Sequence, residues 1–328
     1  MQQPSWVPEY AFKGGDTTIL FKIGSFNFYL YSLMIMLGII ASILTITFFW
    51  TRQKYKSEVL MALILITVPT AIFGARLGYV VEALIYEEKP FANSHWYAAW
   101  DGGLSIQGGI ILAATCDLIY VYFKRDIIDI RKTMSIIIPT ILIGQVIGRW
   151  GNYGNHELYG KIDWTGKSSL VFGKSFAQNM FIVDSVSESI LGKNQGAYRY
   201  PLFLYEGLAN LAGYLLIVWV FNLFGIFKPG STSGFYLIWY GIVRLVMEPM
   251  RQESFALYSI TSLIFIILGT LMFVYFEFLS RIQYVKVWKK YYFEYEYARE
   301  EDYLRWVERT DIIKIIKKKI NEKQTRII

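Results

Sequence analysis

Apolar residues of this 328-residue chain gather in seven long segments, which shorter polar stretches separate. An α-helix rises about 1.5 Å per residue, so roughly 20 apolar residues cross the ~30 Å hydrocarbon core of a membrane. The pattern therefore predicts an all-α polytopic membrane protein with about seven transmembrane helices. The predicted spans cover residues 27–50, 59–85, 103–123, 134–153, 201–224, 233–250 and 255–280.

The distribution of Lys and Arg among the loops predicts the orientation of the spans. The loops 51–58 and 124–133 are rich in basic residues, whereas 86–102 and 251–254 hold one each. Basic loops stay on the cytoplasmic side. With seven spans, this places the N-terminus outside and the C-terminus in the cytoplasm. The first span is too long, and has the wrong flanks, for a cleaved signal peptide.

These spans divide the chain into three parts. We expect an external N-terminal segment over residues 1–26, a seven-span domain over 27–280 and a basic cytoplasmic tail over 281–328. The polar loop 154–200 between the fourth and fifth spans is longer than a connection needs. It predicts a small external head.

The tail has thirteen basic residues against eight acidic ones, and so carries most of the net charge of +7. Lys and Ile alternate over 312–320, and five aromatic residues lie within 291–297. Two interpretations stay open: a basic, partly apolar helix on the anionic lipids of the inner leaflet, and a solvated cytoplasmic helix. Because the charge gathers in the tail and the inner loops, nucleic acid is not an expected partner.

Composition supports a membrane protein and excludes several other classes. Apolar residues make up 54% of the chain and charged residues only 18%, which disfavours a soluble enzyme and a disordered chain. The one cysteine, Cys116, can form no internal disulfide and no thiolate metal site. We expect no metal and no cofactor.

Six charged residues inside the predicted spans stand out, because each needs a partner or a water-filled cavity. They are Arg76, Glu82, Arg149, Glu206, Arg244 and Glu248. Arg244 and Glu248 are four residues apart and could simply neutralise each other. Arg149 has no acidic residue within one turn of its own helix, so its partner comes from elsewhere. A bound phosphate is a candidate, because the guanidinium fork matches phosphate oxygens.

Two glycine-rich segments lie at the ends of predicted spans. Residues 148–160 combine four glycines with Asn152, Asn155 and Glu157, which supply hydrogen-bond donors and acceptors. Residues 102–109 contain four more glycines. Close helix packing is one explanation for glycines in a membrane, and a passage for substrate is the other.

At these residues the sequence resembles the bacterial prolipoprotein diacylglyceryl transferases. Residues 148–160 fill every fixed position of that family's signature, G-R-x-G-N-[FY]-x-N-x-E-x-x-G. The resemblance extends over most of the span region and ends before the tail. It includes the stretches 31–34, 74–79, 100–103, 201–206, 240–244 and 248–252.

The resemblance implies an activity and a set of site residues. Members of the family transfer the sn-1,2-diacylglyceryl group of phosphatidylglycerol to the lipobox cysteine of a preprolipoprotein in the bacterial cell membrane, and release glycerol phosphate. Their two key arginines correspond to Arg149 and Arg244. The surrounding site residues correspond to Tyr31, Asn152, Asn155, Glu157, Gly160, Tyr240 and Glu248.

The sequence departs from the family pattern in three places. Gln107 stands where the family commonly has a histidine before two glycines, so no histidine base is expected there. Tyr200 replaces the histidine of a His-Pro pair, and Thr261-Ser262 replace a Gly-Gln pair.

The implied chemistry suits these residues. The substrate peptide supplies the nucleophilic thiol, so Cys116 is expected only to pack. Arg149 and Arg244 would hold the phosphate and stabilise the charge that develops on the leaving group. Glu157, Glu206 and Tyr31 all stay open as the proton acceptor. Gln107 could orient a group but cannot take its proton, while Gly108 and Gly109, with the glycines at 102–103, would leave room for the lipid.

Two other functions are compatible with intramembrane arginines. The same side chains could line the path of a transporter or flippase for an anionic solute or lipid, although no internal repeat of the spans supports this. Alternatively, the buried charges could pair only with one another in a structural membrane protein.

Overall fold

The computed structural model describes residues 4–24, 26–86, 95–97 and 103–316. The chain is mostly helical and divides into two units. The first comprises residues 1–46 and 134–299, and the second residues 47–133 and 300–328. Helix α1 (Leu30–Arg52) crosses from one unit to the other.

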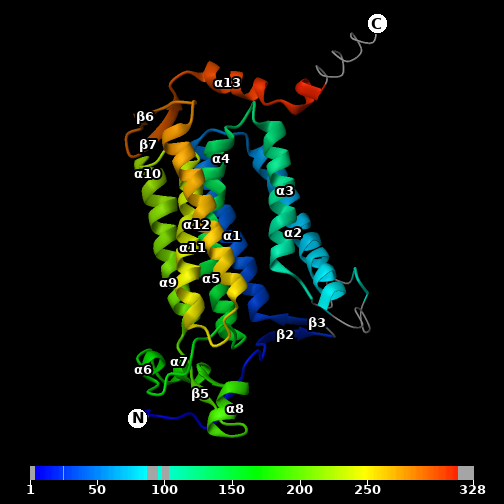
Figure 1. Ribbon diagram of the computed structural model, residues 1–328, viewed down its shortest axis with the longest axis vertical. Helices are drawn as coiled ribbons and strands as arrows, with labels where there is room; N and C mark the ends of the chain where they lie inside the picture. Colours follow the sequence, from blue (N-terminus) through cyan, green and yellow to red (C-terminus); the bar gives the residue numbers. More distant parts are fainter. Residues whose placement is uncertain (1–3, 25, 87–94, 98–102, 317–328) are drawn as a thin grey trace. The chain divides into compact units, whose positions relative to one another are not determined.

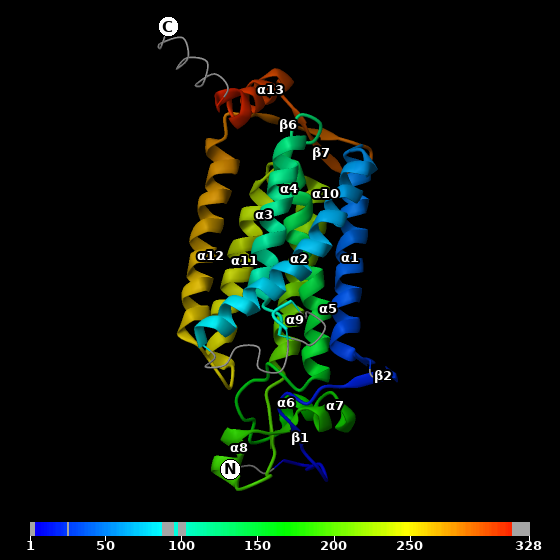
Figure 2. The ribbon, with the colours of Figure 1, turned by 90° about the vertical axis from the view of Figure 1, so that its right-hand side faces the viewer.

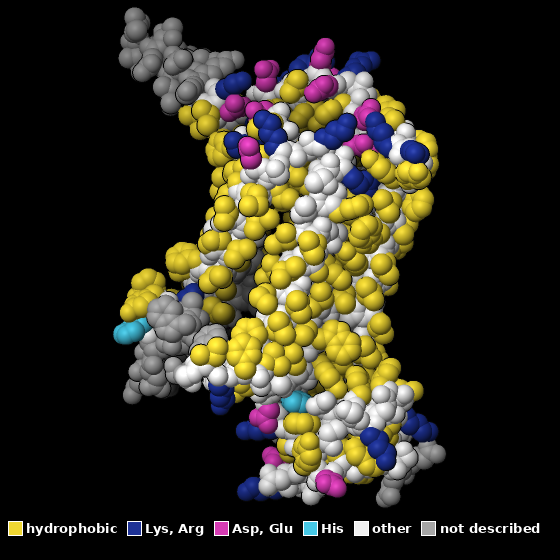
Figure 3. Space-filling model, turned by 180° about the vertical axis from the view of Figure 1, so that it is seen from behind, with side chains coloured by type: hydrophobic (Ala, Val, Ile, Leu, Met, Phe, Trp, Pro, Cys, Tyr) yellow, Lys and Arg dark blue, Asp and Glu magenta, His cyan; other side chains and the backbone are white. Residues whose placement is uncertain are grey.

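Within the described ranges, five helical segments are long and apolar enough to cross a membrane. They are Leu30–Arg52, Ser57–Ile85, Ile130–Gly154, Leu202–Phe224 and Ala256–Leu279. Figure 3 shows apolar side chains covering the sides of the helices, while most Lys and Arg side chains gather near the helix ends. This distribution suits helices surrounded by lipid.

Each of the seven predicted apolar segments contains a helix. Two of these helices, α3 (Ile106–Lys124) and α11 (Ser231–Met247), are not among the five long apolar segments. A short 3-10 turn, Glu248–Met250, continues α11 and contains Pro249. The first helix begins at Leu30, because Phe26–Tyr29 pair as strand β3 with β2 (Ile19–Ile23).

The first unit is a bundle built from five of the predicted spans (Figure 1). Two of its members are α1 and α11. Two further spans are each made of two helices: α4 (Ile130–Ile137) continues through Ile138–Thr140 into α5 (Ile141–Gly154), and α9 (Leu202–Gly213) continues through the π-helical Tyr214–Phe221 into α10 (Asn222–Phe224). The fifth member is α12 (Ala256–Val274), which continues through Tyr275–Leu279. Glycines permit the closest helix contacts. A Cβ on Gly269 would lie 2.6 Å from the Gly234 carbonyl oxygen, so α11 and α12 touch through their backbones.

Residues 154–200 fold into a small α/β region at one end of this bundle (Figure 2). Its elements are α6 (Lys167–Leu170), α7 (Lys174–Asn179), β4 (Phe181–Val183), α8 (Ser185–Leu191) and β5 (Ala197–Tyr198). The N-terminal strand β1 (Phe12–Lys13) pairs in parallel with β4, and β5 pairs antiparallel on its other edge. The chain enters this region from α5 and leaves it into α9, so these two helices run in opposite directions.

The second unit centres on α2 (Ser57–Tyr86) and α3, which pack side by side in both ribbon views (Figure 1, Figure 2). A Cβ on Gly108 would lie 2.7 Å from the Gly78 Cα, so the two helices need glycine at their contact. The Thr67 hydroxyl of α2 donates to both carboxylate oxygens of Asp117 in α3, at 3.0 and 2.8 Å. Helix α13 (Glu300–Arg309) docks on the loop after α3, where the buried Tyr303 hydroxyl donates to the Arg125 carbonyl at 2.7 Å.

The tail is only partly helical, which corrects one expectation. A single basic helix was expected to include the aromatic cluster at 291–297, but strands β6 (Tyr284–Trp288) and β7 (Phe293–Tyr297) form an antiparallel hairpin there. The physical reason is the alternation of aromatic residues with Glu294 and Glu296, which has the period of a strand. Residues 312–316 are helical, whereas the Lys317–Lys319 run lies outside the described residues.

Candidate active site

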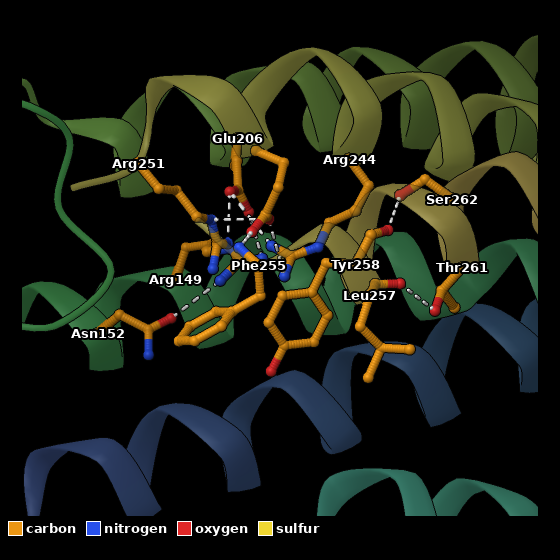
Figure 4. A network of polar contacts seen from close by, with 11 residues as sticks. Arg149, Asn152, Glu206, Arg244, Arg251, Phe255, Leu257, Tyr258, Thr261 and Ser262 are labelled. Atoms are coloured by element: carbon orange, nitrogen blue, oxygen red, sulfur yellow. Dashed lines mark hydrogen bonds and ion pairs between the residues drawn. The ribbon is translucent and has the colours of Figure 1, made fainter. Parts of the chain in front are cut away.

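A buried cluster of ion pairs surrounds Glu206, one turn into α9 (Figure 4). Arg149 from α5 pairs with one carboxylate oxygen of Glu206. Arg251 Nη2 lies 2.8 Å from the other oxygen, and Arg244 Nη1 lies 3.7 Å from it. The acidic partner that Arg149 lacked on its own helix therefore comes from α9.

Glu248 is the second carboxylate of the cluster. Its Oε2 lies 3.5 Å from Arg244 Nη2 and 3.6 Å from Arg251 Nε. Its Oε1 accepts a hydrogen bond of 3.1 Å from the Phe255 backbone N–H, just before α12. The predicted pairing of Arg244 with Glu248 is confirmed, but it belongs to a larger network that three helices and the turn at Arg251 build together.

The charges of this network do not balance. Three arginines (Arg149, Arg244 and Arg251) face two glutamates (Glu206 and Glu248), which leaves 3 − 2 = +1. The side chains of Arg149 and Arg244 keep 15% and 14% of their surface exposed, against 3% and 2% for the glutamates. Within these ion pairs, the two arginines are therefore more accessible than the two carboxylates, as the binding of an anion requires.

Arg149 also has capacity for a further acceptor. Its Nε is buried and has no hydrogen-bond partner among the residues that the structure describes. Its Nη1 donates to Asn152 Oδ1 at 3.3 Å. The guanidinium is thus held from two sides, and its buried Nε–H has no acceptor among these residues.

The end of α5 connects Arg149 to the carboxylate of Glu157. The Asn152 amide donates to Glu157 Oε2 at 3.5 Å, and the Asn155 amide donates to Glu157 Oε1 at 3.2 Å. Leu158 has a φ of 53°, so the chain turns sharply just after Glu157. Glu157 is half-buried and hydrogen-bonded to neutral amides, in contrast to Glu206 among its arginines.

Tyr31, the second residue of α1, lies beside the end of α5, which carries Arg149 and is followed by Glu157. A Cβ on Gly151 would lie 3.2 Å from the Tyr31 Cα and 2.7 Å from its ring, so glycine at 151 lets α1 approach α5. Tyr31 lies within electrostatic range of both Glu157 and Arg149. The structure thus brings Tyr31, Arg149 and Glu157 together from two helices.

Tyr240 and Gly160 complete the part of the predicted site that lies in the first unit. Tyr240, one turn before Arg244 on α11, lies within electrostatic range of Arg149. Gly160 pairs with Arg251 in an isolated bridge, and its N–H donates to the Tyr200 carbonyl at 2.9 Å. A Cβ on Gly160 would lie 3.2 Å from the Met250 carbonyl oxygen, so this close backbone pairing depends on glycine.

Gln107, Gly108 and Gly109 lie on α3, in the second unit. Gly108 and Gly109 make the close contact with α2, since a Cβ on Gly109 would lie 2.9 Å from the Ala71 carbonyl oxygen. Gln107 is exposed. These contacts explain the two glycines by helix packing, while their predicted role toward lipid stays a prediction.

The other two predicted intramembrane charges are satisfied within the second unit. The Arg76 guanidinium donates to the backbone carbonyls of His95 and Gly103, at 2.6 and 3.1 Å. Glu82 accepts a hydrogen bond of 2.6 Å from the Ser105 hydroxyl. Both stabilise the connection between α2 and α3.

The sequence reasoning missed Arg251 as a member of the site. It was counted as a loop charge, because it follows the end of the sixth apolar segment. Its spacing of three residues from Glu248 was the available signal, since residues at this spacing share a helix face. Asp117, in the middle of α3, was also overlooked.

Outside the spans, a second ion pair positions the backbone of Arg251. Arg199 is fully buried, donates to Asp184 Oδ1 and donates to Gln252 Oε1 at 2.7 Å. Burial lowers the pKa of Arg199, and Asp184 partly offsets this effect. Burial, reinforced by Asp184, raises the pKa of Tyr159, whose hydroxyl donates to Asp184 at 3.0 Å. Residues 154–200 are thereby fastened to the turn that carries Arg251.

Comparisons with known proteins agree with these features. A family model described as prolipoprotein diacylglyceryl transferase matches residues 18–275. A protein named phosphatidylglycerol–prolipoprotein diacylglyceryl transferase, from Mycoplasmopsis pulmonis (strain UAB CTIP), is 50% identical over 269 residues, which are 81% of this chain and 82% of that protein. A protein of the same name from Streptococcus uberis (strain ATCC BAA-854 / 0140J) is 34% identical over 256 residues, which are 76% of this chain and 92% of its own length.

Proposed function

This chain belongs to the prolipoprotein diacylglyceryl transferase family, and we propose that the cluster around Glu206 is where it binds the phosphate of its lipid substrate. The enzyme transfers the sn-1,2-diacylglyceryl group from phosphatidylglycerol to the lipobox cysteine thiol of preprolipoproteins. The products are a thioether and glycerol phosphate. Family membership favours this function over a transporter or flippase.

The surplus charge of the cluster is the observation that carries the proposal. Phosphatidylglycerol has one phosphodiester with a charge of about −1, which the +1 of the cluster would neutralise. Arg149 and Arg244, the two more exposed arginines, would contact the phosphate. Asn152, Asn155, Gly160, Tyr240, Glu206 and Glu248 would hold these arginines and the lipid in place.

The reaction is a displacement at the glyceryl carbon that carries the phosphate. The thiol sulfur forms the new C–S bond, the C–O bond breaks, and its electron pair leaves on the phosphate oxygen. Arg149 and Arg244 stabilise that developing charge. Their positive field also favours the thiolate form of the substrate cysteine.

Among the three candidate proton acceptors, the geometry supports Glu157. Both carboxylate oxygens of Glu206 are occupied by ion pairs with three arginines. Glu157 accepts hydrogen bonds only from neutral amides among the described residues, and lies near Tyr31. We propose that Glu157 accepts the proton of the substrate thiol and that Tyr31 orients this thiol. Gln107, Gly108 and Gly109 are proposed to contact the lipid, as the family resemblance implies.

We further propose the membrane arrangement. Helices α3 and α11 have 19 and 17 residues. Together with the five longer segments they would bring the number of membrane spans to seven. Residues 154–200 would form an external head, with the N-terminus outside the bacterial cytoplasmic membrane and the C-terminus inside. The lipobox cysteine becomes available at that outer surface.

The tail is proposed to contact anionic lipids of the inner leaflet. The Tyr122 hydroxyl, at the end of α3, donates to the Thr310 carbonyl and accepts from the Ile312 N–H at 2.7 and 2.8 Å. The isoleucines at 312, 313, 315 and 316 are all exposed. Apolar side chains beside Lys314, next to the end of a membrane helix, suit the interface between lipid and water.

The function is tested by mass spectrometry of a lipobox peptide. We expect a mass gain of one diacylglyceryl group after incubation with the purified protein and phosphatidylglycerol, and none with phosphatidylcholine alone. Glycerol phosphate should appear in equal amount. Movement of phosphatidylglycerol across vesicles without any modified peptide would contradict the proposal and support a flippase.

A further inference from the structure

A second layer of polar side chains lies one helical turn deeper in the bundle than the arginine cluster. Gln145 precedes Arg149 by four residues on α5, and Asn210 follows Glu206 by four on α9. Because α5 and α9 run in opposite directions, both steps lead the same way along the bundle. Tyr240 lies four residues before Arg244 on α11, which runs as α5 does. The three side chains therefore lie at one level.

The acceptor atoms of this layer have no partners. Asn210 is only 2% exposed, and its Oδ1 has no hydrogen-bond donor among the described residues. Gln145 Oε1 is likewise buried without a donor in that part of the chain. Buried oxygens inside a membrane bundle are costly unless something fills their hydrogen-bonding capacity.

An unpartnered donor lies close to the same level. The buried Nε1 of Trp239 has no acceptor within the described ranges. This Nε1 packs against α9, where it is the atom that a Cβ on Gly213 would meet most closely. Gly213 is three residues beyond Asn210. The layer thus offers two free acceptors and one free donor beneath a phosphate-binding cluster.

From this arrangement we infer that Asn210 and Gln145, with Trp239, bind the free glycerol of the phosphatidylglycerol head group. This inference rests on the proposed phosphate site. The head group has two hydroxyls, each a donor and an acceptor. In an extended glycerol, the outer hydroxyl lies roughly one helical turn, ~5.4 Å, from the phosphorus. With the phosphate on Arg149 and Arg244, the hydroxyls reach the layer below and donate to the two amide oxygens.

A comparison of two soluble phosphate esters tests this subsite. Glycerol 1-phosphate carries both hydroxyls, whereas ethyl phosphate carries neither, and both can occupy the arginine cluster. We would measure how strongly each inhibits lipidation of a lipobox peptide by the full-length protein in phosphatidylglycerol vesicles. Glycerol 1-phosphate should inhibit the wild-type protein about ten-fold more strongly, the gain expected from one or two hydrogen bonds to otherwise unpartnered groups.

Variants of Asn210 and Gln145 test whether these side chains cause the difference in inhibition between the two esters. Asn210→Leu and Gln145→Leu should each reduce the ratio of the two inhibition constants to about two or less, mainly by weakening glycerol 1-phosphate. Asn222→Leu is the matched control, because Asn222 lies three turns further along the same helical segment and donates to the Val218 carbonyl at 3.1 Å. It should keep the wild-type ratio.

The possible outcomes distinguish a failure of the glycerol subsite from a failure of the proposed transferase function. Equal inhibition of the wild-type protein by the two esters, or an unchanged ratio in both leucine variants, would overturn the subsite and leave only water between these side chains. If Asn210→Leu does not fold, Gln145→Leu and the wild-type comparison still decide. A wild-type protein that makes no thioether would instead contradict the proposed function.

Discussion

At the scale of single residues, the decisive feature is the sharing of two carboxylates among three guanidinium groups. A cluster that only neutralised itself would have equal numbers of the two charges. Here Glu206 contacts all three arginines, and Glu248 contacts Arg244 and Arg251. Burial makes the remaining positive charge expensive until an anion arrives, so the site is arranged to bind one.

Replacement of Arg149 tests this feature at one side chain. Arg149→Ala should lower thioether formation by about 100-fold or more, because an electrostatic contact to the leaving phosphate is lost. Arg149→Lys should recover only part of the rate, since it restores charge without the fork. Arg305→Ala, at an exposed arginine of α13, is the control and should have no effect. Wild-type turnover by a correctly inserted Arg149→Ala protein would remove Arg149 from the mechanism.

At the scale of elements, the site depends on backbone contacts that only glycine permits. Gly151 brings α1 onto α5, and Gly160 holds the turn that carries Arg251. Both belong to the glycine-rich segment 148–160. Their function is to set distances between elements whose side chains then meet.

The contact at Gly160 yields a graded prediction. Gly160→Ala would place a Cβ 2.9 Å from the Tyr200 Cβ and 3.1 Å from its carbonyl oxygen, so the bridge to Arg251 must shift. We expect at least a ten-fold loss of kcat/KM with normal expression. Gly144→Ala is the control, because its Cβ would meet nothing closer than the Ser42 hydroxyl at 3.4 Å. Equal activities of the two variants would argue against this role.

Helices were largely predictable from the sequence, and contacts between them were not. Long apolar runs predicted a helix in every expected span, because the membrane requires that length. The pairing of Arg149 with Glu206 joins residues 57 positions apart, by 206 − 149, and no pattern along one helix indicates it. The alternation in β7 has the period of a strand, whereas the basic charge of the tail and its Lys and Ile residues over 312–320 favoured a helix.

At the scale of the whole chain, each unit includes part of the tail, although the family match ends at residue 275. In the first unit, the Tyr295 hydroxyl of β7 donates to the Gly225 carbonyl at 2.9 Å. In the second, Arg125 donates to the Val307 carbonyl and the Thr310 hydroxyl, at 3.0 and 2.9 Å. The tail is thus a folded part of the protein, fastened near the ends of helices.

Labelling of single cysteines tests the proposed orientation. Cys116→Ser should retain wild-type activity, because the half-buried thiol is free and the substrate supplies the nucleophile. In that background a membrane-impermeant maleimide should label Lys193→Cys in intact cells. It should label Lys56→Cys only after permeabilisation, since both positions are exposed but lie on opposite sides. The reverse pattern would invert the arrangement, and an inactive Cys116→Ser protein would give that thiol a function.

The surplus positive charge is the central claim, and its most direct test is the KM for phosphatidylglycerol in charge-altered variants. Arg251→Gln reduces the balance to 2 − 2 = 0, and the double variant Glu248→Gln, Arg251→Gln restores 2 − 1 = +1. We predict that KM rises about ten-fold in the single variant, the equivalent of ~1.4 kcal/mol, and falls back at least part of the way in the double variant. A double variant with a KM as high as that of Arg251→Gln, or higher, would contradict the claim.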